Sequence, residues 1–135
     1  MSLFRIFDIS GSALHAQSVR LNTTASNMAN MDSISSSISQ TYRAREPVFA
    51  AQLDEAEDGI AGVSVLGIVE SDKPLRQEYR PDHPLADAKG YVNLPNVNPV
   101  EEMANMISAS RAYQANVEVL NTSKQMMMRT LALGE

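Results

Sequence analysis

The C-terminal part of the chain decides the fold, because it predicts one long helix with a regular apolar repeat. Residues 98–134 read NPVEEMANMISASRAYQANVEVLNTSKQMMMRTLALG. The residues that recur at every seventh position are Met106, Tyr113, Leu120 and Met127. A seven-residue repeat places side chains along one line of an α-helix, and such a line is buried against another helix.

Both ends of this helix carry recognisable signals. Asn98 is a good N-cap, Pro99 suits the first helical position, and Glu101 stands where a capping box needs an acid. We expect the helix to continue to about Leu133, where Gly134 can close it. At ~1.5 Å per residue it would be roughly 50 Å long.

The N-terminal part of the chain predicts a second helix, from residue 3 to about residue 30, with Ser2 as its cap. Its heptad positions are Phe7, Leu14, Leu21 and Met28, and the adjoining, mostly small row is Phe4, Gly11, Ser18 and Ala25. Glycine costs roughly 1 kcal/mol relative to alanine inside a helix, so we expect Gly11 to admit a close neighbouring backbone. Asn27 and Asn30 are expected to end the helix, since asparagine tolerates the left-handed conformation found there.

Two apolar lines on only two helices leave flanks that one small domain cannot cover. We therefore expect the heptad rows and their flanks to contact each other and neighbouring subunits. The residues of this predicted assembly interface are Phe7, Leu14, Leu21, Met28, Met103, Met106, Tyr113, Val117, Leu120, Met127 and Leu131.

Three consecutive methionines near the C-terminus bear on the same question. Met126, Met127 and Met128 span roughly 200° of the helix surface, so one face cannot hold all three. They are either ordinary core fillers or a surface that packs against several different neighbours. The second interpretation is favoured, because the chain is too short to surround this helix by itself.

The middle of the chain contains the β-structure that the sequence predicts. Residues 47–53 and 62–69 predict two strands, and Asp58-Gly59 predicts the turn of a hairpin between them. The serine-rich residues 32–40 predict a linker, and residues 72–94 predict irregular polar chain.

The expected fold is therefore mainly α with a small β middle. The N- and C-terminal helices are expected to pair as an antiparallel coiled coil, with a β-hairpin and extended chain between them. We expect residues 1–31 to form the N-terminal helix, residues 32–97 the linker and hairpin, and residues 98–135 the C-terminal helix.

Composition excludes several classes of function. The net charge of −5 argues against wholesale binding of nucleic acid phosphates. The negative charge lies in residues 32–95, which hold eleven acids and six bases, so the helical ends are neutral and free to pack against copies of themselves. The sequence has no cysteine and no apolar run of the ~20 residues that a membrane span needs. Its first residues lack the pattern of a cleaved secretory signal.

A search for catalytic chemistry finds little. His15 lies within the predicted N-terminal helix, where a packing role is favoured over catalysis. Asp82, His83 and Asp87 could supply metal ligands, but they have no recognised ligand spacing and lie in a proline-bounded loop. The sequence therefore predicts no enzyme, no cofactor and no metal site, and a metal hydrolase built on His83 is the enzymatic alternative.

Several motifs resemble a known family. Residues 25–30, ASNMAN, resemble the signature shared by bacterial flagellar axial proteins. The stretches of the second half that resemble the proximal rod proteins of this family are RPDHPLAD at 80–87, GYV at 90–92, PNVN at 95–98, VEEMANM at 100–106, SRAYQAN at 110–116 and LNTSKQMM at 120–127. The resemblance covers nearly the whole chain, and residues 33–39 and His15 are its least typical parts.

This resemblance implies a structural subunit of the proximal rod of the flagellar basal body, which carries torque from the motor to the hook around the export channel. It implies export through the flagellar type III apparatus without a cleaved signal, and assembly in the periplasm. The implied partners are copies of the chain, other proximal rod proteins, the rod-base adaptor, the distal rod protein and the membrane-embedded ring. The alternatives are another rod-type axial protein, or a helical adaptor or export chaperone that works as a discrete dimer.

Overall fold

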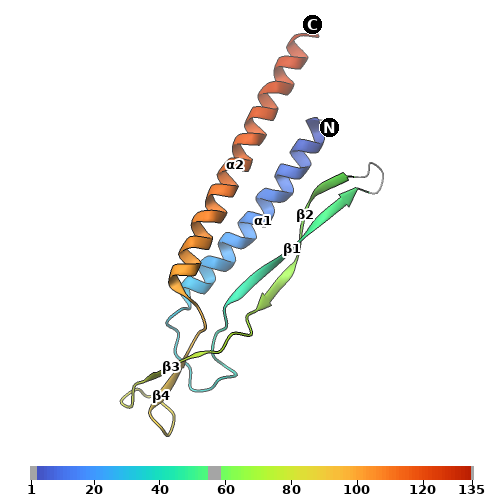
Figure 1. Ribbon diagram of the computed structural model, residues 1–135. Coiled ribbons are helices and arrows are strands. Elements are labelled where there is room, and N and C mark those ends of the chain that lie inside the picture. The colour runs from blue at the N-terminus through green and yellow to red at the C-terminus, as the bar shows by residue number, and fades with distance from the viewer. Residues whose placement is uncertain (1–2, 55–58, 135) are drawn as a thin grey trace.

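The computed structural model describes residues 3–54 and 59–134 of the chain. Two long helices lie side by side, with one two-stranded sheet beside them and another below them (Figure 1). In chain order the elements are α1 (Leu3–Ala29), β1 (Arg45–Asp54), β2 (Gly59–Glu70), β3 (Arg76–Tyr79), β4 (Tyr91–Leu94) and α2 (Pro99–Ala132).

The two helices run in opposite directions, so both ends of the chain lie at the same end of the molecule (Figure 1). α2 has 34 residues against 27 in α1, and its C-terminal part extends beyond the start of α1. The structure thus confirms the predicted mainly α fold with a small β middle and an antiparallel pair of terminal helices.

α1 has the predicted extent, although Ser2, its expected cap, lies outside the described residues. At its other end the Asn30 side-chain amide donates a hydrogen bond to the Ser26 carbonyl at 2.8 Å. Asn27 has a different role from the one the sequence predicted. It lies within the helix, and its side chain bonds to the backbone of β1.

α2 begins as predicted, with the Asn98 Oδ1 accepting a hydrogen bond from the Val100 amide at 3.1 Å. The Glu101 carboxylate forms an ion pair with Lys73 at 3.7 Å. The end also lies where the sequence predicted it, since the helix runs to Ala132 and Leu133 is the C-cap, whose amide donates to the Arg129 carbonyl.

The predicted hairpin is confirmed, since β1 and β2 pair antiparallel from Arg45 opposite Glu70 to Asp54 opposite Gly59. The ladder shifts register after Val48 and again after Gln52. Such irregularities increase the twist of a two-stranded ribbon and bend it, here along the side of α1. The centre of the predicted turn, residues 55–58, lies outside the described residues.

Residues 72–94 are more regular than the sequence predicted, because β3 and β4 pair antiparallel within them. All four residues of β3 are exposed, so the strand lacks the apolar alternation that marks a half-buried strand. The rings of Tyr79 and Tyr91 meet edge to face, with centroids 5.3 Å apart. Gly90 adopts a φ of +83°, and a Cβ there would lie 2.8 Å from the Tyr79 ring.

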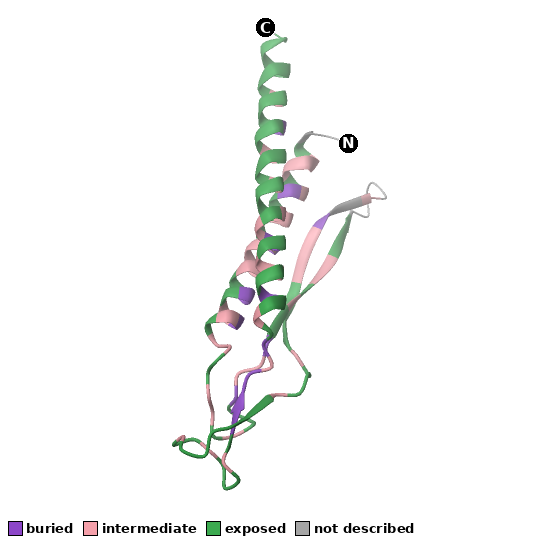
Figure 2. Ribbon diagram, turned by 60° about the vertical axis from the view of Figure 1, so that its left-hand side comes forward, coloured by how far each residue is buried: buried purple, intermediate pink, exposed green. Residues whose placement is uncertain are grey.

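The enclosed part of the molecule lies around β4 and the helix ends nearest to it (Figure 2). The largest fully buried side chains are Val92, Val97, Asn27 and Pro95. By contrast, α2 exposes large apolar side chains along its length, among them Met103, Ile107, Val119, Met126, Met128 and Leu131. Isolated surface apolar residues are ordinary, but a helix with this many has an apolar surface that a neighbour can cover.

Candidate assembly site

Some of the predicted interface residues are half-buried in the structure, and the others are exposed. On α1, the four heptad residues Phe7, Leu14, Leu21 and Met28 are all half-buried. On α2, Met106, Leu120 and Met127 are half-buried, whereas Tyr113 and Val117 are each 37 % exposed and Met103 and Leu131 more so. Each row thus keeps part of its surface available outside the chain.

The most enclosed row of α2 is one that sequence reasoning missed. Its buried residues are Glu102, Ala109 and Ser123, which again differ by multiples of seven. Ala109 and Ser123 are small, which lets α1 approach closely. A heptad of small residues was the available signal, but the search for large apolar side chains overlooked it.

Gly11 has no close neighbour within the chain. It is exposed, and a Cβ placed on it would have nothing within 4 Å. The expected close approach therefore is not made by α2, β1 or β2, and it remains a prediction for a neighbouring subunit.

The close approach that the structure does contain joins α1 to the hairpin at Ser12. The Ser12 hydroxyl donates to the Ile9 carbonyl at 2.8 Å and accepts from the Val63 amide at 3.1 Å. Gly62 lies directly against it, since a Cβ there would be 2.5 Å from the Ser12 Oγ and 3.2 Å from its Cβ. Glycine at 62 thus lets β2 cross the helix at backbone distance.

Gly62→Ala is expected to destabilise the protein by about 1–3 kcal/mol, because the added methyl group forces the hairpin away from Ser12. The free energy of unfolding in urea measures this loss. Gly67→Ala, in the same strand with nothing within 4 Å, is the matched control and should cost much less. Equal losses for the two variants would show that the crossing does not depend on the glycine.

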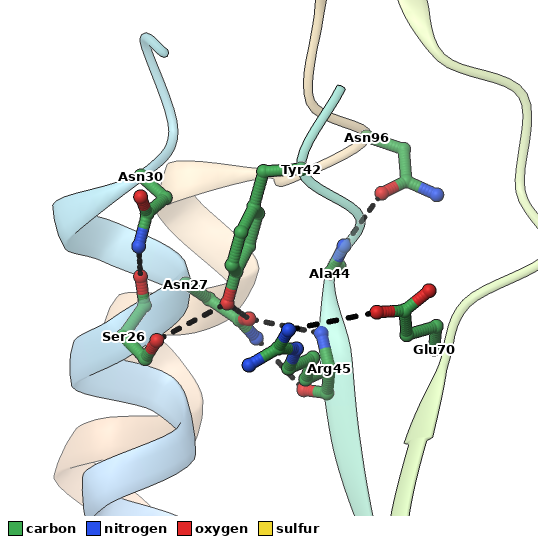
Figure 3. A network of polar contacts seen from close by, with 8 residues as sticks. All are labelled: Ser26, Asn27, Asn30, Tyr42, Ala44, Arg45, Glu70 and Asn96. Atoms are coloured by element: carbon green, nitrogen blue, oxygen red, sulfur yellow. Dashed lines mark hydrogen bonds and ion pairs between the residues drawn. The ribbon is translucent and has the colours of Figure 1, made fainter. Parts of the chain in front are cut away.

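A polar junction centred on Asn27 joins α1 to the start of β1 (Figure 3). The Asn27 side-chain amide donates to the Arg45 carbonyl at 2.8 Å. Its Oδ1 accepts from the Arg45 amide at 2.9 Å and from the Tyr42 hydroxyl at 2.8 Å. The residue is only 1 % exposed, so one buried side chain satisfies the backbone of the first residue of β1.

Side chains around Asn27 extend the junction to both strands of the hairpin. The Ser26 and Tyr42 hydroxyls lie 3.3 Å apart, and the Arg45 guanidinium stacks 5.4 Å from the centre of the Tyr42 ring (Figure 3). The same guanidinium lies 3.6 Å from the Glu70 carboxylate at the end of β2.

A second asparagine ties the chain before α2 to the same place. The Asn96 Oδ1 accepts from the Ala44 amide at 2.7 Å (Figure 3). Its side-chain amide donates to the Ser71 and Lys73 carbonyls, at 3.2 and 2.8 Å. Arg76 adds a further link, because its guanidinium donates to the Pro95 and Met31 carbonyls. Hydrogen bonds from side chains to the backbone thus hold together four segments that are distant in sequence, namely Met31, Ala44, residues 71–76 and residues 95–96.

Glu102 is the one acidic side chain in the enclosed row of α2. Burial is the main reason that the pKa of its carboxyl is raised, and the nearby charges of Glu101 and Glu46 raise it further. The side chains of Asn27 and Thr24 act in the opposite direction as hydrogen-bond donors.

The loop between β3 and β4 was the alternative candidate for a metal site. Asp87 there accepts hydrogen bonds from the amides of Tyr91 and Lys89, and the Tyr91 bond is the main cause of its lowered pKa. His83 Nδ1 accepts a bond from the Leu85 amide. Among residues 3–54 and 59–134, no three His, Asp or Glu side chains come together as a metal site. In the same part of the chain, no helix is both long and apolar enough to cross a bilayer.

Comparison with known proteins identifies the family of the chain. Residues 7–33 match the family model of the flagella basal body rod protein, and residues 88–133 match that of the flagellar basal body rod FlgEFG protein C-terminal region. The chain is 55 % identical to the flagellar basal-body rod protein FlgC of Yersinia enterocolitica and to that of Salmonella typhimurium, and 56 % identical to that of Escherichia coli O157:H7. Each match covers all of both chains. The chain therefore belongs to the FlgC family of flagellar basal-body rod proteins.

Proposed function

We propose that the protein is a structural subunit of the proximal rod of the flagellar basal body. The observation that carries this proposal is the 55 % identity, over the full length of both chains, to basal-body rod proteins named FlgC. The architecture supports it, since a paired helix that exposes apolar residues along its length is suited to packing among neighbouring subunits. The function of such a subunit is mechanical, and no catalytic step is part of it.

Within the rod, we propose that the chain transmits torque from the motor to the hook and helps to enclose the export channel. A long antiparallel helix pair resists bending better than a single helix, because each helix supports the other along the contact. The hydrogen bonds of Asn27 and Asn96 to the start of the hairpin would hold it at a fixed angle to the helix pair. Force applied to the hairpin would then reach the helices, and the reverse.

The proposed neighbours are copies of the chain, other proximal rod proteins, the rod-base adaptor, the distal rod protein and the membrane-embedded ring. The predicted interface residues, from Phe7 on α1 to Leu131 on α2, would supply the apolar part of these contacts. We further propose that the chain passes through the type III export apparatus without a cleaved signal and takes its place in the periplasm.

Purified basal bodies provide the test. A strain that lacks the gene should form the membrane-embedded ring without a rod, and a plasmid copy should restore rod, hook and swimming. The protein, with its N-terminus intact by mass spectrometry, should be present in the restored basal bodies. If the restored strain swims while its basal bodies lack the protein, the chain is an adaptor or export chaperone rather than a rod subunit.

A further inference from the structure

Glu102 lies where three elements meet, and its surroundings are unusual for a carboxylate. The residue is 8 % exposed and faces a cavity of about 380 Å³. Residues of α1, β1 and α2 line this cavity, and they include Arg20, Thr24, Arg45, Glu46, Glu101 and Asn105. A carboxylate that is removed from water is costly unless a cation compensates it.

The two cations that line the cavity, Arg20 and Arg45, bind to residues other than Glu102. The Arg20 guanidinium donates to the Asn105 Oδ1 at 3.0 Å, and Arg45 pairs with Glu70. Within the described residues, neither is close enough to Glu102 to form an ion pair with it. The other charged groups at the cavity are Glu46 on β1 and Glu101 on α2, which carry the same sign as Glu102. Ionised Glu102 is therefore desolvated beside two like charges, and the hydrogen bonds from the Asn27 and Thr24 side chains offset these costs only in part, since the pKa remains raised.

We propose that Glu102 is a pH-sensitive contact at the meeting point of α1, α2 and β1. The three elements pack tightly when its carboxyl is neutral, and their packing loosens when the carboxyl is ionised. The cavity gives water and protons access to the group, so the change needs no unfolding of the chain. The carboxyl lies beside Asn27, which bonds directly to the backbone of β1, so a change at Glu102 reaches the hairpin through one side chain. The inference concerns the junction itself and holds whether or not the proposed rod function does.

The direction of the effect follows from the raised pKa of Glu102. The stability that neutral Glu102 contributes is complete below the pKa of an unfolded glutamate, about 4.3. It is lost as the pH rises through the higher pKa of the folded state. Asp87 has the opposite sign, because its lowered pKa gives stability that is lost as the pH falls. A measurement local to the junction is therefore needed to separate the two groups.

Amide hydrogen exchange on the full chain, corrected for the intrinsic effect of pH, measures how tightly these three elements pack. As the pH is lowered from about 7.5 to about 4, below the pKa of an unfolded glutamate, protection of the amides in residues 24–30 and 100–106 should increase severalfold. In Glu102→Gln the same amides should be as protected at both pH values as the natural chain is in acid. Glu101→Gln, which removes the adjacent exposed carboxylate, should keep the pH response but move its midpoint to lower pH, because the Glu101 charge also raises the pKa of Glu102.

Glu46→Gln extends the test to an exposed residue of β1. Removing one like charge should move the midpoint of the response to lower pH without abolishing it. Protection that does not depend on pH in the natural chain, or an undiminished response in Glu102→Gln, would overturn the proposal. A midpoint unmoved by Glu46→Gln would overturn it independently, even if Glu102→Gln failed to fold.

Discussion

Replacement of Asn27 by leucine is expected to lower the free energy of unfolding by about 3–5 kcal/mol, a large fraction of the stability of a domain of this size. Leucine branches at the same carbon as asparagine but cannot form hydrogen bonds, so the polar groups left behind are unsatisfied, and its larger methyl groups add to the loss. The Arg45 amide, the Arg45 carbonyl and the Tyr42 hydroxyl all lose a partner at a site that is 1 % exposed. Urea denaturation followed by circular dichroism measures the change.

Two further variants show whether the loss belongs to this junction. Asn22→Leu, on an exposed position of the same helix, should have little effect. Tyr42→Phe removes one hydroxyl from the junction and should cost about 1 kcal/mol. If Asn27→Leu is no more destabilising than Asn22→Leu, the bonds to Arg45 do not hold the hairpin.

Leu120→Asp is expected to abolish rod assembly and swimming completely. The position is half-buried on α2, next to the row that packs against α1, and it belongs to the predicted interface. An ionised carboxylate placed between packed helices costs several kcal/mol unless a cation meets it. Because the proposed function is assembly, the defect should be all-or-none, with the protein made but absent from basal bodies.

The matched control for this substitution is Asn121→Asp, which adds the same charge at the next position, where the side chain is exposed. Those cells should swim normally. Normal swimming of Leu120→Asp cells would show that this row is not the working surface. Loss of motility from substitutions at Asp82 or His83 would direct the search to the loop between β3 and β4.

The sequence predicted the helices well because their signals are local and periodic. Asn98 and Pro99 mark the start of α2 by their own chemistry, and the heptads require a partner helix whatever its identity. The hairpin was likewise evident from apolar runs on either side of an Asp-Gly turn.

The rest depended on contacts that sequence patterns do not encode. β3 has only exposed residues and is recognisable only through its pairing with β4. Asn27 belongs to the motif that resembled axial proteins, yet its partners Tyr42 and Arg45 are 15 and 18 residues away. The burial of Glu102 could not be predicted, because an acid in the first turn of a helix is common whether or not the side chain is buried.

The central claim is that the apolar surface left open on α2 is covered when the chain takes its place in the rod. The chain contains no cysteine, so a single Met128→Cys substitution gives a unique probe at a position that is 61 % exposed. The measurement is the rate of maleimide labelling in the free chain, in intact basal bodies and in the same basal bodies after denaturation. We predict rapid labelling of the free and denatured protein and strong protection in intact basal bodies, whereas equally rapid labelling in all three would contradict the claim.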